Sequence, residues 1–240
     1  LVTPDGAVSA PLAGVPPVFA QGQGGLLDVA LDPDYAVNGW VYLSFAEDRG
    51  SGTNATTVMR AKLAGAALED AQIIFRQQPA VESPAHFGGR LVFGRDGRLF
   101  ITLGERAGRQ FIERAQSLDD HFGKIIRIER NGGIPADNPF VGRADARPEI
   151  WSYGHRNPQG AMIHPVTGEL WSTEHGPKGG DELNVVRAGR NYGWPVITYG
   201  TAYSGEKIGI GAHQQGMEQP LHYWVPSIAP SGLAIYQGNL

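Results

Sequence analysis

The segment "GRLVFGRDGRLFITLGE" (residues 89–105) joins two apolar runs through a tight turn built on Asp96 and Gly97. Glycine supplies the positive φ angle that tight hairpin turns require. The flanking runs are rich in Val, Ile, Leu and Phe, as buried strands are. The segment therefore predicts a β-hairpin, and the fold depends on how often this hairpin recurs.

The same hairpin pattern returns along the chain. It appears in "LLDVALDPDYAVNGWVYLSF" (26–45) and "GAMIHPVTGELWSTEHG" (160–176), and a further copy begins at "SGLAIYQGNL" (231–240). The turn glycines of the first three copies are 58 and 71 residues apart, which leaves room for two more strands in each interval. Four antiparallel strands per repeat are typical of a β-propeller blade. An ordinary β-sandwich is the alternative, but equal hairpins at such long spacing favour the propeller.

We therefore expect an all-β fold in which residues 1–240 form a single β-propeller domain of four-stranded antiparallel blades. The last copy of the pattern stops inside a hairpin, so a ring of blades does not close within this sequence. The spacing predicts about four blades, and the domain is expected to be incomplete. The closing blades would belong to a longer protein.

Composition excludes several classes of function. The net charge is −4 and the 20 Lys and Arg residues are scattered, which argues against a nucleic-acid partner. The absence of cysteine excludes disulfides, thiolate metal sites and cysteine nucleophiles. No apolar run approaches the ~18 residues of a membrane span. The opening "LVTPDGAVSAPLAG" has neither an initiator Met nor a basic region, so we expect any signal peptide to lie outside this sequence.

Two polar clusters stand at equivalent ends of successive hairpins. "AQGQGGLLD" (20–28) contains Gln21 and Gln23, and "AHFGGR" (85–90) places His86 where a strand begins. A single histidine of this kind is more often a hydrogen-bonded structural group than a base. Glycines beside His86 allow a ligand or another backbone to come close. Equivalent ends of blades converge on one face near the propeller axis, which favours a shared site there.

A third cluster, "SYGHRNPQG" (152–160), contains His155, Arg156, Asn157 and Gln159 on one loop. Arg, Asn and Gln present planar donors that suit the carbonyls and carboxylates of a flat ligand. The alternative is a loop whose polar side chains only satisfy nearby backbone groups. Convergence with the other two clusters favours a binding site.

The stretch "WSTEHGPKGGDELN" (171–184) follows a strand-like run and contains three acidic residues, a proline and three glycines. Glycine and proline leave backbone carbonyls exposed, and these add to the carboxylate oxygens. Such oxygen-rich segments suit a hard cation such as Ca²⁺. This stretch therefore predicts a calcium site.

Taken together, these stretches resemble the soluble pyrroloquinoline quinone (PQQ)-dependent glucose and aldose sugar dehydrogenases, the glucose/sorbosone dehydrogenase family. The resemblance runs in order from about residue 16 to the end of the chain. It is carried by "GQGGLLDVALDPDY", "HFGGRLVFGRDGRLFITLGE", "DDHFGKIIRIERNGGIPADNPF", "IWSYGHRNPQGAMIHPVTGELWSTEHGPKGGDELN", "GRNYGWP" and "PSIAPSGLAIYQGN". It implies a six-bladed β-propeller with PQQ lying flat on its axis.

The resemblance also implies an activity and the residues that perform it. Such an enzyme oxidises the anomeric carbon of an aldose sugar to the lactone by hydride transfer to calcium-bound PQQ. His86 matches the histidine base, and Glu105 stands where family members often carry an aspartate that orients this histidine. Arg156 and Asn157 match the pair that contacts the quinone oxygens.

Further cofactor and metal residues follow from the same resemblance. Gln23 matches a glutamine near the rim of PQQ, and Gln159 lies in the same motif as the quinone contacts. The cofactor's Ca²⁺ is held by main-chain carbonyls that match Gly176 and Pro177. A second, structural Ca²⁺ uses residues that match Glu182 and the main-chain oxygen of Tyr192. The cofactor and metal residues that the resemblance implies in this way are Gln23, Gln159, Gly176, Pro177, Glu182 and Tyr192.

The resemblance leaves two other classes of function open. A cofactor-less, calcium-binding propeller could serve as an interaction module, and a calcium-dependent propeller lactonase is a third reading. The basic residues that bind the PQQ carboxylates in the family have no counterpart up to Leu240. The joint presence of the quinone contacts nevertheless favours the dehydrogenase. The family then implies an aldose substrate, an external electron acceptor and a periplasmic or secreted location in a bacterium.

Overall fold

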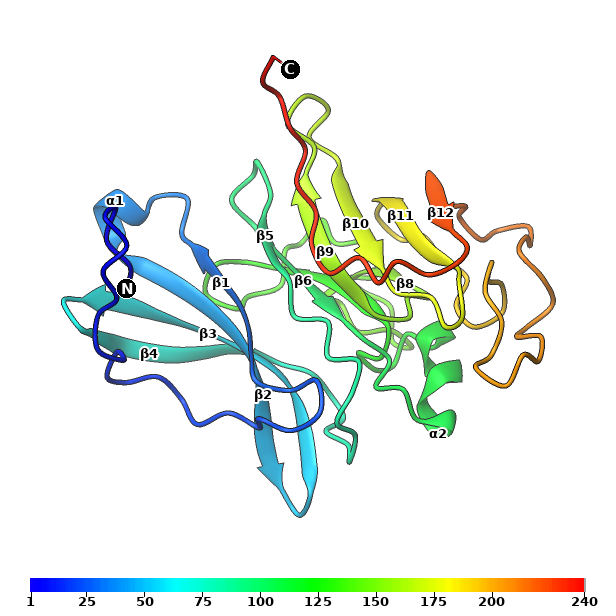
Figure 1. The fold of residues 1–240 in the computed structure, drawn as a ribbon, viewed down its shortest axis with the longest axis horizontal. Coiled ribbons are helices and arrows are strands. Elements are labelled where there is room, and N and C mark those ends of the chain that lie inside the picture. The colour runs from blue at the N-terminus through cyan, green and yellow to red at the C-terminus, as the bar shows by residue number, and fades with distance from the viewer. Residues whose placement is uncertain (240) are drawn as a thin grey trace.

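The computed structural model describes residues 1–239 and consists mainly of three four-stranded antiparallel sheets (Figure 1). The first sheet is formed in chain order by β1 (Leu26–Leu31), β2 (Trp40–Gly50), β3 (Thr53–Ala64) and β4 (Ala67–Arg76). The second is formed by β5 (Leu91–Phe93), β6 (Leu99–Leu103), β7 (Lys124–Ile128) and β8 (Ile150–Tyr153). The third is formed by β9 (Pro158–Ile163), β10 (Leu170–Glu174), β11 (Asp181–Val186) and β12 (His222–Trp224). The helical segments are the short α1 (Tyr35–Asn38), α2 (Arg109–Ile112) and the 3₁₀ helix η1 (Glu113–Gln116).

The first two strands of each sheet are the hairpins that the sequence predicts. Their turn glycines Gly39, Gly97 and Gly168 have φ angles of 68°, 77° and 76°. Only glycine adopts this left-handed region without strain, which explains why the turns recur with the same residue. The prediction of an all-β fold with four-stranded antiparallel repeats is therefore confirmed.

The core lies in layers between neighbouring sheets, and β6 shows how it forms. Ile101 of β6 packs with Tyr42 and Val58 of the first sheet. Phe100, the next residue back, points to the opposite face and packs with Leu170 of the third sheet. Both faces of β6 are thus buried, which is why its sequence is apolar throughout instead of alternating.

The sheets are arranged as propeller-like blades. Strand β1 contacts β5, and β5 contacts β9, so the first strands of the three sheets lie next to one another. The outer strands spread away from this centre (Figure 1). Consequently, the loops that enter β5 and β9 reach the same central region.

The last copy of the hairpin pattern does not form a strand. Residues 231–239 are extended coil in the structure. This segment lies against β9, where a Cβ on Gly160 would come within 2.8 Å of the Gly232 carbonyl carbon. The described residues therefore contain three complete sheets, and the expected fourth is not formed. Within residues 1–239, no helix has the length and apolar character needed to cross a membrane.

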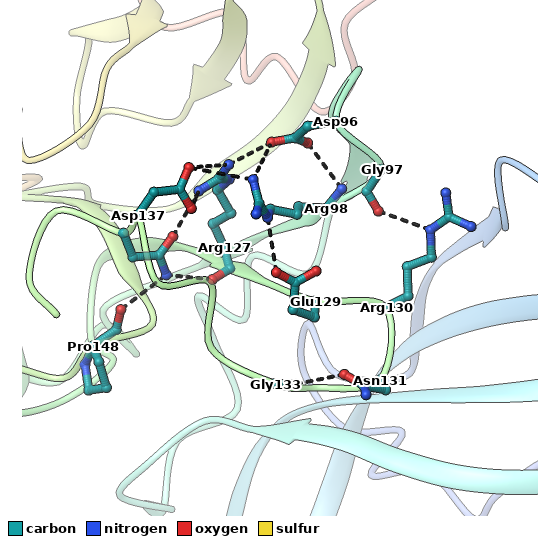
Figure 2. Close-up of polar contacts among 11 residues, drawn as sticks. Asp96, Gly97, Arg98, Arg127, Glu129, Arg130, Asn131, Gly133, Asp137 and Pro148 are labelled. Carbon is teal, nitrogen blue, oxygen red and sulfur yellow. Dashed lines mark hydrogen bonds and ion pairs between the residues drawn. The ribbon is translucent and has the colours of Figure 1, made fainter.

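An ion-pair network fastens one end of the second sheet (Figure 2). The buried Arg127 of β7 binds Asp96 in the β5–β6 turn at 2.5 Å and Asp137 in the following loop at 3.1 Å. Its guanidinium carbon also lies 4.9 Å from the centre of the Trp151 ring. Arg127 therefore joins the hairpin turn to the loop that precedes β8.

Candidate active site

The predicted site residues come from loops that meet at the centre of the three sheets. His86 lies in the loop before β5, Glu105 follows β6, and Asn157 lies between β8 and β9. The Glu105 backbone N–H donates to the Arg156 carbonyl at 2.9 Å. The Gly88 N–H donates to the Asn157 side-chain oxygen at 3.1 Å. The structure thus brings these predicted residues together, although they are far apart in the sequence.

His86 and Glu105 form a buried pair. The imidazole Nδ1 of His86 lies 3.0 Å from Oε2 of Glu105. Because a carboxylate only accepts hydrogen bonds, Nδ1 carries the hydrogen and Nε2 keeps a free lone pair. The His86 backbone N–H donates to Oε1 of Gln23 at 2.8 Å. The arrangement presents one nitrogen of a fixed imidazole as a proton acceptor.

Arg156 has a donor that the described residues leave unpaired. Its Nη1 donates to the His175 carbonyl at 3.0 Å, and its backbone N–H donates to Oε2 of Glu174 at 2.7 Å. Its Nε is buried and has no hydrogen-bond partner within residues 1–239. A donor buried this completely lies out of reach of a ligand oxygen, so a ligand would have to meet the rest of the Arg156 guanidinium.

Gln23 and Gln159 line one cavity of about 150 Å³ near the centre of the sheets. Arg90 also lines this cavity and makes hydrogen bonds to three separate segments of the chain. It binds Asp28 of β1 at 2.9 Å, the carbonyl of Gln159 at 3.0 Å and the carbonyl of Ser231 at 3.2 Å. The two glutamines are therefore placed beside a positive charge, which suits an anionic or carbonyl-rich ligand.

The Gly176–Pro177 turn is held from one side by Asp181. The Gly176 N–H donates to Oδ1 of Asp181 at 2.8 Å. Neither the Gly176 carbonyl nor the Pro177 carbonyl accepts a hydrogen bond from any other residue in the 1–239 range. A Cβ on Gly176 would lie 2.3 Å from the Gly179 carbonyl oxygen, so only glycine fits. Within residues 1–239 both carbonyls therefore lack a protein donor, and a hard cation accepts carbonyl oxygens of this kind as ligands.

Asp181 binds a second segment through its other oxygen. Oδ2 accepts hydrogen bonds of 2.7 Å from the Ser227 hydroxyl and from the backbone N–H groups of Ile228 and Ala229. Burial alone would raise the pKa of Asp181, but these bonds and that from Gly176 lower it below its ordinary value. Asp181 therefore remains ionised and ties the Gly176–Pro177 turn to the segment that follows β12.

Glu182 and Tyr192 line a cavity of about 10 Å³ that Glu174 also lines. This is about the space of one water molecule or ion. Burial and the charge of Glu174 raise the pKa of Glu182 to about 8. The Tyr192 hydroxyl turns away and donates to the Val185 carbonyl at 2.6 Å. Two carboxyl groups around a space of this size suit a bound cation.

Ser152, His155 and Glu174 form a hydrogen-bonded chain that has the composition of a hydrolase triad. The Ser152 hydroxyl lies 2.8 Å from Nε2 of His155, whose Nδ1 lies 3.0 Å from Oε1 of Glu174. The exposed fractions of Ser152 and His155 are both 0%. A nucleophile must reach its substrate, so this chain supports Glu174 and gives no accessible serine.

Side chains alone do not form a metal centre in the part of the chain that the structure describes. No group of three or more His, Cys, Asp or Glu side chains there could hold a metal ion. The candidate ligands instead combine backbone carbonyls with one or two carboxylates. Calcium accepts such mixed oxygen ligands, so the residues present fit Ca²⁺.

Sequence reasoning missed several residues that shape the site. Glu174, Asp181, Arg90 and Arg106 act mainly through backbone groups of other loops. Glu174 and Asp181 lie inside the oxygen-rich stretch 171–184. The acidic residues gathered in this stretch are the signal that could have identified them. No comparable signal marks Arg106.

Known proteins with similar sequences and structures include sugar dehydrogenases. A family model described as "Glucose / Sorbosone dehydrogenase" matches residues 1–240. The chain is 48% identical over 236 residues to "Aldose sugar dehydrogenase YliI" of Escherichia coli (strain K12), a match that covers 97% of this chain and 63% of that protein. A crystal structure of glucose dehydrogenase superimposes with a TM-score of 0.90 at 52% identity, covering 93% of this chain and 65% of the other.

A more distant structure contains a cofactor. It is the PQQ-bound form of aldose sugar dehydrogenase (Adh) from Streptomyces coelicolor, with a TM-score of 0.70 and 32% identity over 92% of this chain and 60% of the other. The present chain thus spans less than two thirds of the length of each of these relatives.

Proposed function

Since the chain belongs to the glucose/sorbosone dehydrogenase family, we propose that its protein oxidises the anomeric carbon of an aldose sugar to the lactone with calcium-bound PQQ. The observation that supports this most directly is the buried His86–Glu105 pair, 3.0 Å apart, at the centre where the loops meet. A PQQ-bound relative at 32% identity supports the choice of cofactor.

The reaction needs an acceptor for a hydride and an acceptor for a proton. Bound PQQ would supply the quinone that takes the hydride of the anomeric carbon. His86 would take the proton of the anomeric hydroxyl at Nε2. Glu105 would keep the hydrogen on Nδ1 and stabilise the imidazolium that results.

Other side chains of this chain would hold the cofactor and favour charge transfer. Arg156 would direct the positive charge of its guanidinium toward the quinone oxygens, where negative charge develops. Asn157 would use its side-chain nitrogen, because its oxygen already accepts from Gly88. Gln23 and Gln159 would line the edge of the cofactor.

Calcium would occupy two places in this proposal. The carbonyls of Gly176 and Pro177 would bind the ion that also binds PQQ. Glu182 and the main-chain oxygen of Tyr192 would bind a structural ion in the 10 Å³ cavity beside Glu174. Within residues 1–239 no residue donates a hydrogen bond to the Gly176 or Pro177 carbonyl, which supports the first assignment. The proximity of the Glu182 and Glu174 carboxyl groups supports the second.

We further propose that the whole protein closes into a single six-bladed propeller. The outward residues Leu26, Val29 and Leu31 of β1 are more than half exposed and line an apolar groove of about 530 Å³. Exposed apolar surface of this extent suits packing against a further blade. A periplasmic or secreted location and a separate electron acceptor belong to the same proposal.

Cofactor reconstitution tests the function against a cofactor-less interaction module. The full-length gene product would be incubated with PQQ and calcium, and glucose-dependent reduction of an artificial electron-accepting dye would be measured. The proposal predicts activity that requires PQQ and calcium, and that is lost in His86→Ala. An interaction module would neither bind PQQ, as judged by its absorbance, nor reduce the dye.

A further inference from the structure

Arg106 is an arginine that is completely buried beside the proposed base. It lies in the loop between β6 and α2, and its exposed fraction is 0%. Its guanidinium carbon lies 3.9 Å from the centre of the ring of Phe87, the residue that follows His86. The guanidinium therefore makes a cation–π contact with Phe87. A fully buried guanidinium has to donate its N–H groups to protein acceptors, because water cannot reach it. The acceptors of Arg106 therefore show which segments it holds together.

Two of the four hydrogen bonds of Arg106 go to carbonyl groups of the His86 loop, and the other two go to Asn54 of β3. Its Nε donates to the Ala85 carbonyl at 3.0 Å, and its Nη2 donates to the Ser83 carbonyl at 2.6 Å. On the other side, it is anchored to β3, because Nη2 also lies 2.5 Å from the side-chain oxygen of Asn54. Arg106 therefore fastens the loop before His86 to the first sheet.

The peptide bond between Ala85 and His86 is held at both of its polar atoms. Its carbonyl accepts from Arg106, and its N–H donates to the Gln23 side chain at 2.8 Å. The imidazole of the same residue is bound by Glu105. The backbone and the side chain of His86 are thus held by separate groups.

The backbone of His86 needs such support because of its conformation. The φ angle of His86 is 52°, in the left-handed region that non-glycine residues rarely adopt. Arg106 itself has a φ angle of 70°. Strained residues persist only where their surroundings hold them, and they are concentrated at functional sites.

We propose that Arg106 is a positioning residue that fixes the backbone of His86, so that Nε2 points toward the substrate while Nδ1 stays on Glu105. The inference rests on the proposed role of His86 as the base. Arg106 touches none of the reacting atoms, and it acts through the Ala85 and Ser83 carbonyls. Burial lowers the pKa of Arg106 to about 10, so the guanidinium keeps its charge and all its donors at neutral pH.

The test compares Arg106→Met and Arg106→Lys with a matched control, Arg127→Met, in the full-length protein. Arg127 is also buried and also stacks on an aromatic ring, but its partners Asp96 and Asp137 lie in the network of Figure 2 and not in the His86 loop. The first readout is the ¹⁵N NMR signal of the His86 ring in protein free of PQQ, which reports whether Nδ1 carries the hydrogen. The second is the effect on kcat and KM after reconstitution.

For Arg106→Met, we expect the single Nδ1–H signal of His86 to become a mixture of both ring forms. We expect kcat to fall by roughly 10- to 100-fold, with KM for the sugar changed by less than about threefold, as a small misplacement of a catalytic group does. Arg106→Lys keeps a charge but cannot span both carbonyls, so it should show a smaller change in the same direction. Arg127→Met should keep the wild-type signal and kcat.

Wild-type NMR signals and kcat in both Arg106 variants would overturn the inference. If Arg106→Met does not fold, Arg106→Lys decides by the same two readouts. An equal change in Arg127→Met would also overturn it, because the effect would then follow from lost stability alone. The NMR readout needs no activity, so it decides the role of Arg106 even if the reconstituted wild-type protein oxidises no sugar and the proposed function fails.

Discussion

Glu174 and Glu182 stand directly opposite each other on the paired strands β10 and β11. Directly opposed side chains of an antiparallel pair share one face of the sheet, so the two carboxyl groups face the same small cavity. Burial and the charge of Glu174 raise the pKa of Glu182 to about 8. The metal-free protein therefore holds a proton on Glu182 at neutral pH, at the place that we assign to a structural calcium ion.

The first prediction is that calcium binding to this cavity releases a proton. The folded-state pKa of Glu182, about 8, lies above its unfolded value of ~4.3, so the metal-free protein should lose stability as pH rises through this window. Calcium replaces the proton, and its affinity should increase by up to about tenfold per pH unit between pH 6 and 8. Calorimetric calcium titrations at these two pH values, in buffers of different ionisation enthalpy, measure both effects. A calcium affinity that does not change with pH would contradict the assignment.

The second prediction concerns Glu182→Gln. The amide resembles the protonated acid, so the melting temperature without calcium should change little. The rise in melting temperature on adding calcium should become much smaller, because the charge that binds the ion is gone. Glu169→Gln is a matched control, since Glu169 lies just before β10 and pairs with Arg187 near the surface. The prediction is wrong if both variants keep the full calcium-dependent rise.

The hairpins could be predicted from the sequence because their determinants are local. A turn glycine at positive φ and two apolar runs are enough to define β1–β2, β5–β6 and β9–β10. The fourth sheet could not be decided in this way. Residues 231–239 have a strand-like pattern, but a strand needs a hydrogen-bonded neighbour, and they pair with none of the described strands.

The site could be predicted only in part. Motifs that resemble a family predict His86, Glu105 and Arg156, and the structure places these residues in neighbouring loops. Arg106 could not be found, because its role depends on which distant carbonyls lie next to it in space. A pairing between a side chain and the backbone of another loop leaves no pattern in a single sequence. The partners of Asp181 beyond residue 226 could not be foreseen for the same reason, although Asp181 itself lies in the oxygen-rich stretch 171–184.

The third prediction concerns Arg156→Lys. Lysine keeps the positive charge but loses the planar fork of donors, so it cannot reproduce the hydrogen-bond geometry of the guanidinium. If the guanidinium stabilises charge that develops during hydride transfer, kcat should fall by roughly 10²- to 10³-fold, and PQQ affinity should fall much less. Arg190→Lys, at an exposed ion pair with Glu218, is the control. A weaker PQQ titration with unchanged kcat would show that Arg156 only holds the cofactor.

The fourth prediction concerns stability at acidic pH. His121 is buried, its Nδ1 accepts from the Gln78 N–H at 2.9 Å, and its Nε2 lies 2.7 Å from Glu149. Burial lowers the pKa of His121 in spite of Glu149, and Arg147 and Lys124 act in the same direction as burial. Because the pKa of His121 is lower in the folded than in the unfolded protein, the neutral imidazole contributes to the stability of the fold. This contribution is complete above the unfolded pKa of ~6.5 and is lost as pH falls below it.

Urea unfolding between pH 7.5 and 5 measures this effect. The wild-type free energy of unfolding should decrease by up to about 1.4 kcal/mol per pH unit from this group. In His121→Gln, the amide can still accept from Gln78 and donate to Glu149, but it does not titrate. The variant should therefore show a flatter dependence on pH. An identical slope in both proteins would assign the acid sensitivity to other groups.

The last prediction concerns the proposed base. In His86→Ala, the reconstituted full-length protein should lose roughly 10²- to 10⁴-fold in kcat, the usual contribution of a positioned general base. PQQ binding, followed separately by absorbance, should remain nearly intact, because Arg156, Asn157 and the Gly176–Pro177 carbonyls are unchanged. Glu105→Gln should have a smaller effect, since an amide oxygen can still accept the Nδ1 hydrogen while the charge that stabilises the imidazolium is lost.

His213→Ala provides the control, because His213 is exposed and contacts Tyr199 at 3.3 Å, away from the central loops. Its kcat and its PQQ titration should equal those of the wild type. Near-normal kcat for His86→Ala at saturating PQQ and calcium would make His86 a structural histidine. The 3.0 Å contact with Glu105 and the unusual backbone of His86 would then serve only to close the loop before β5, and the proton acceptor would have to be another group at the centre of the sheets.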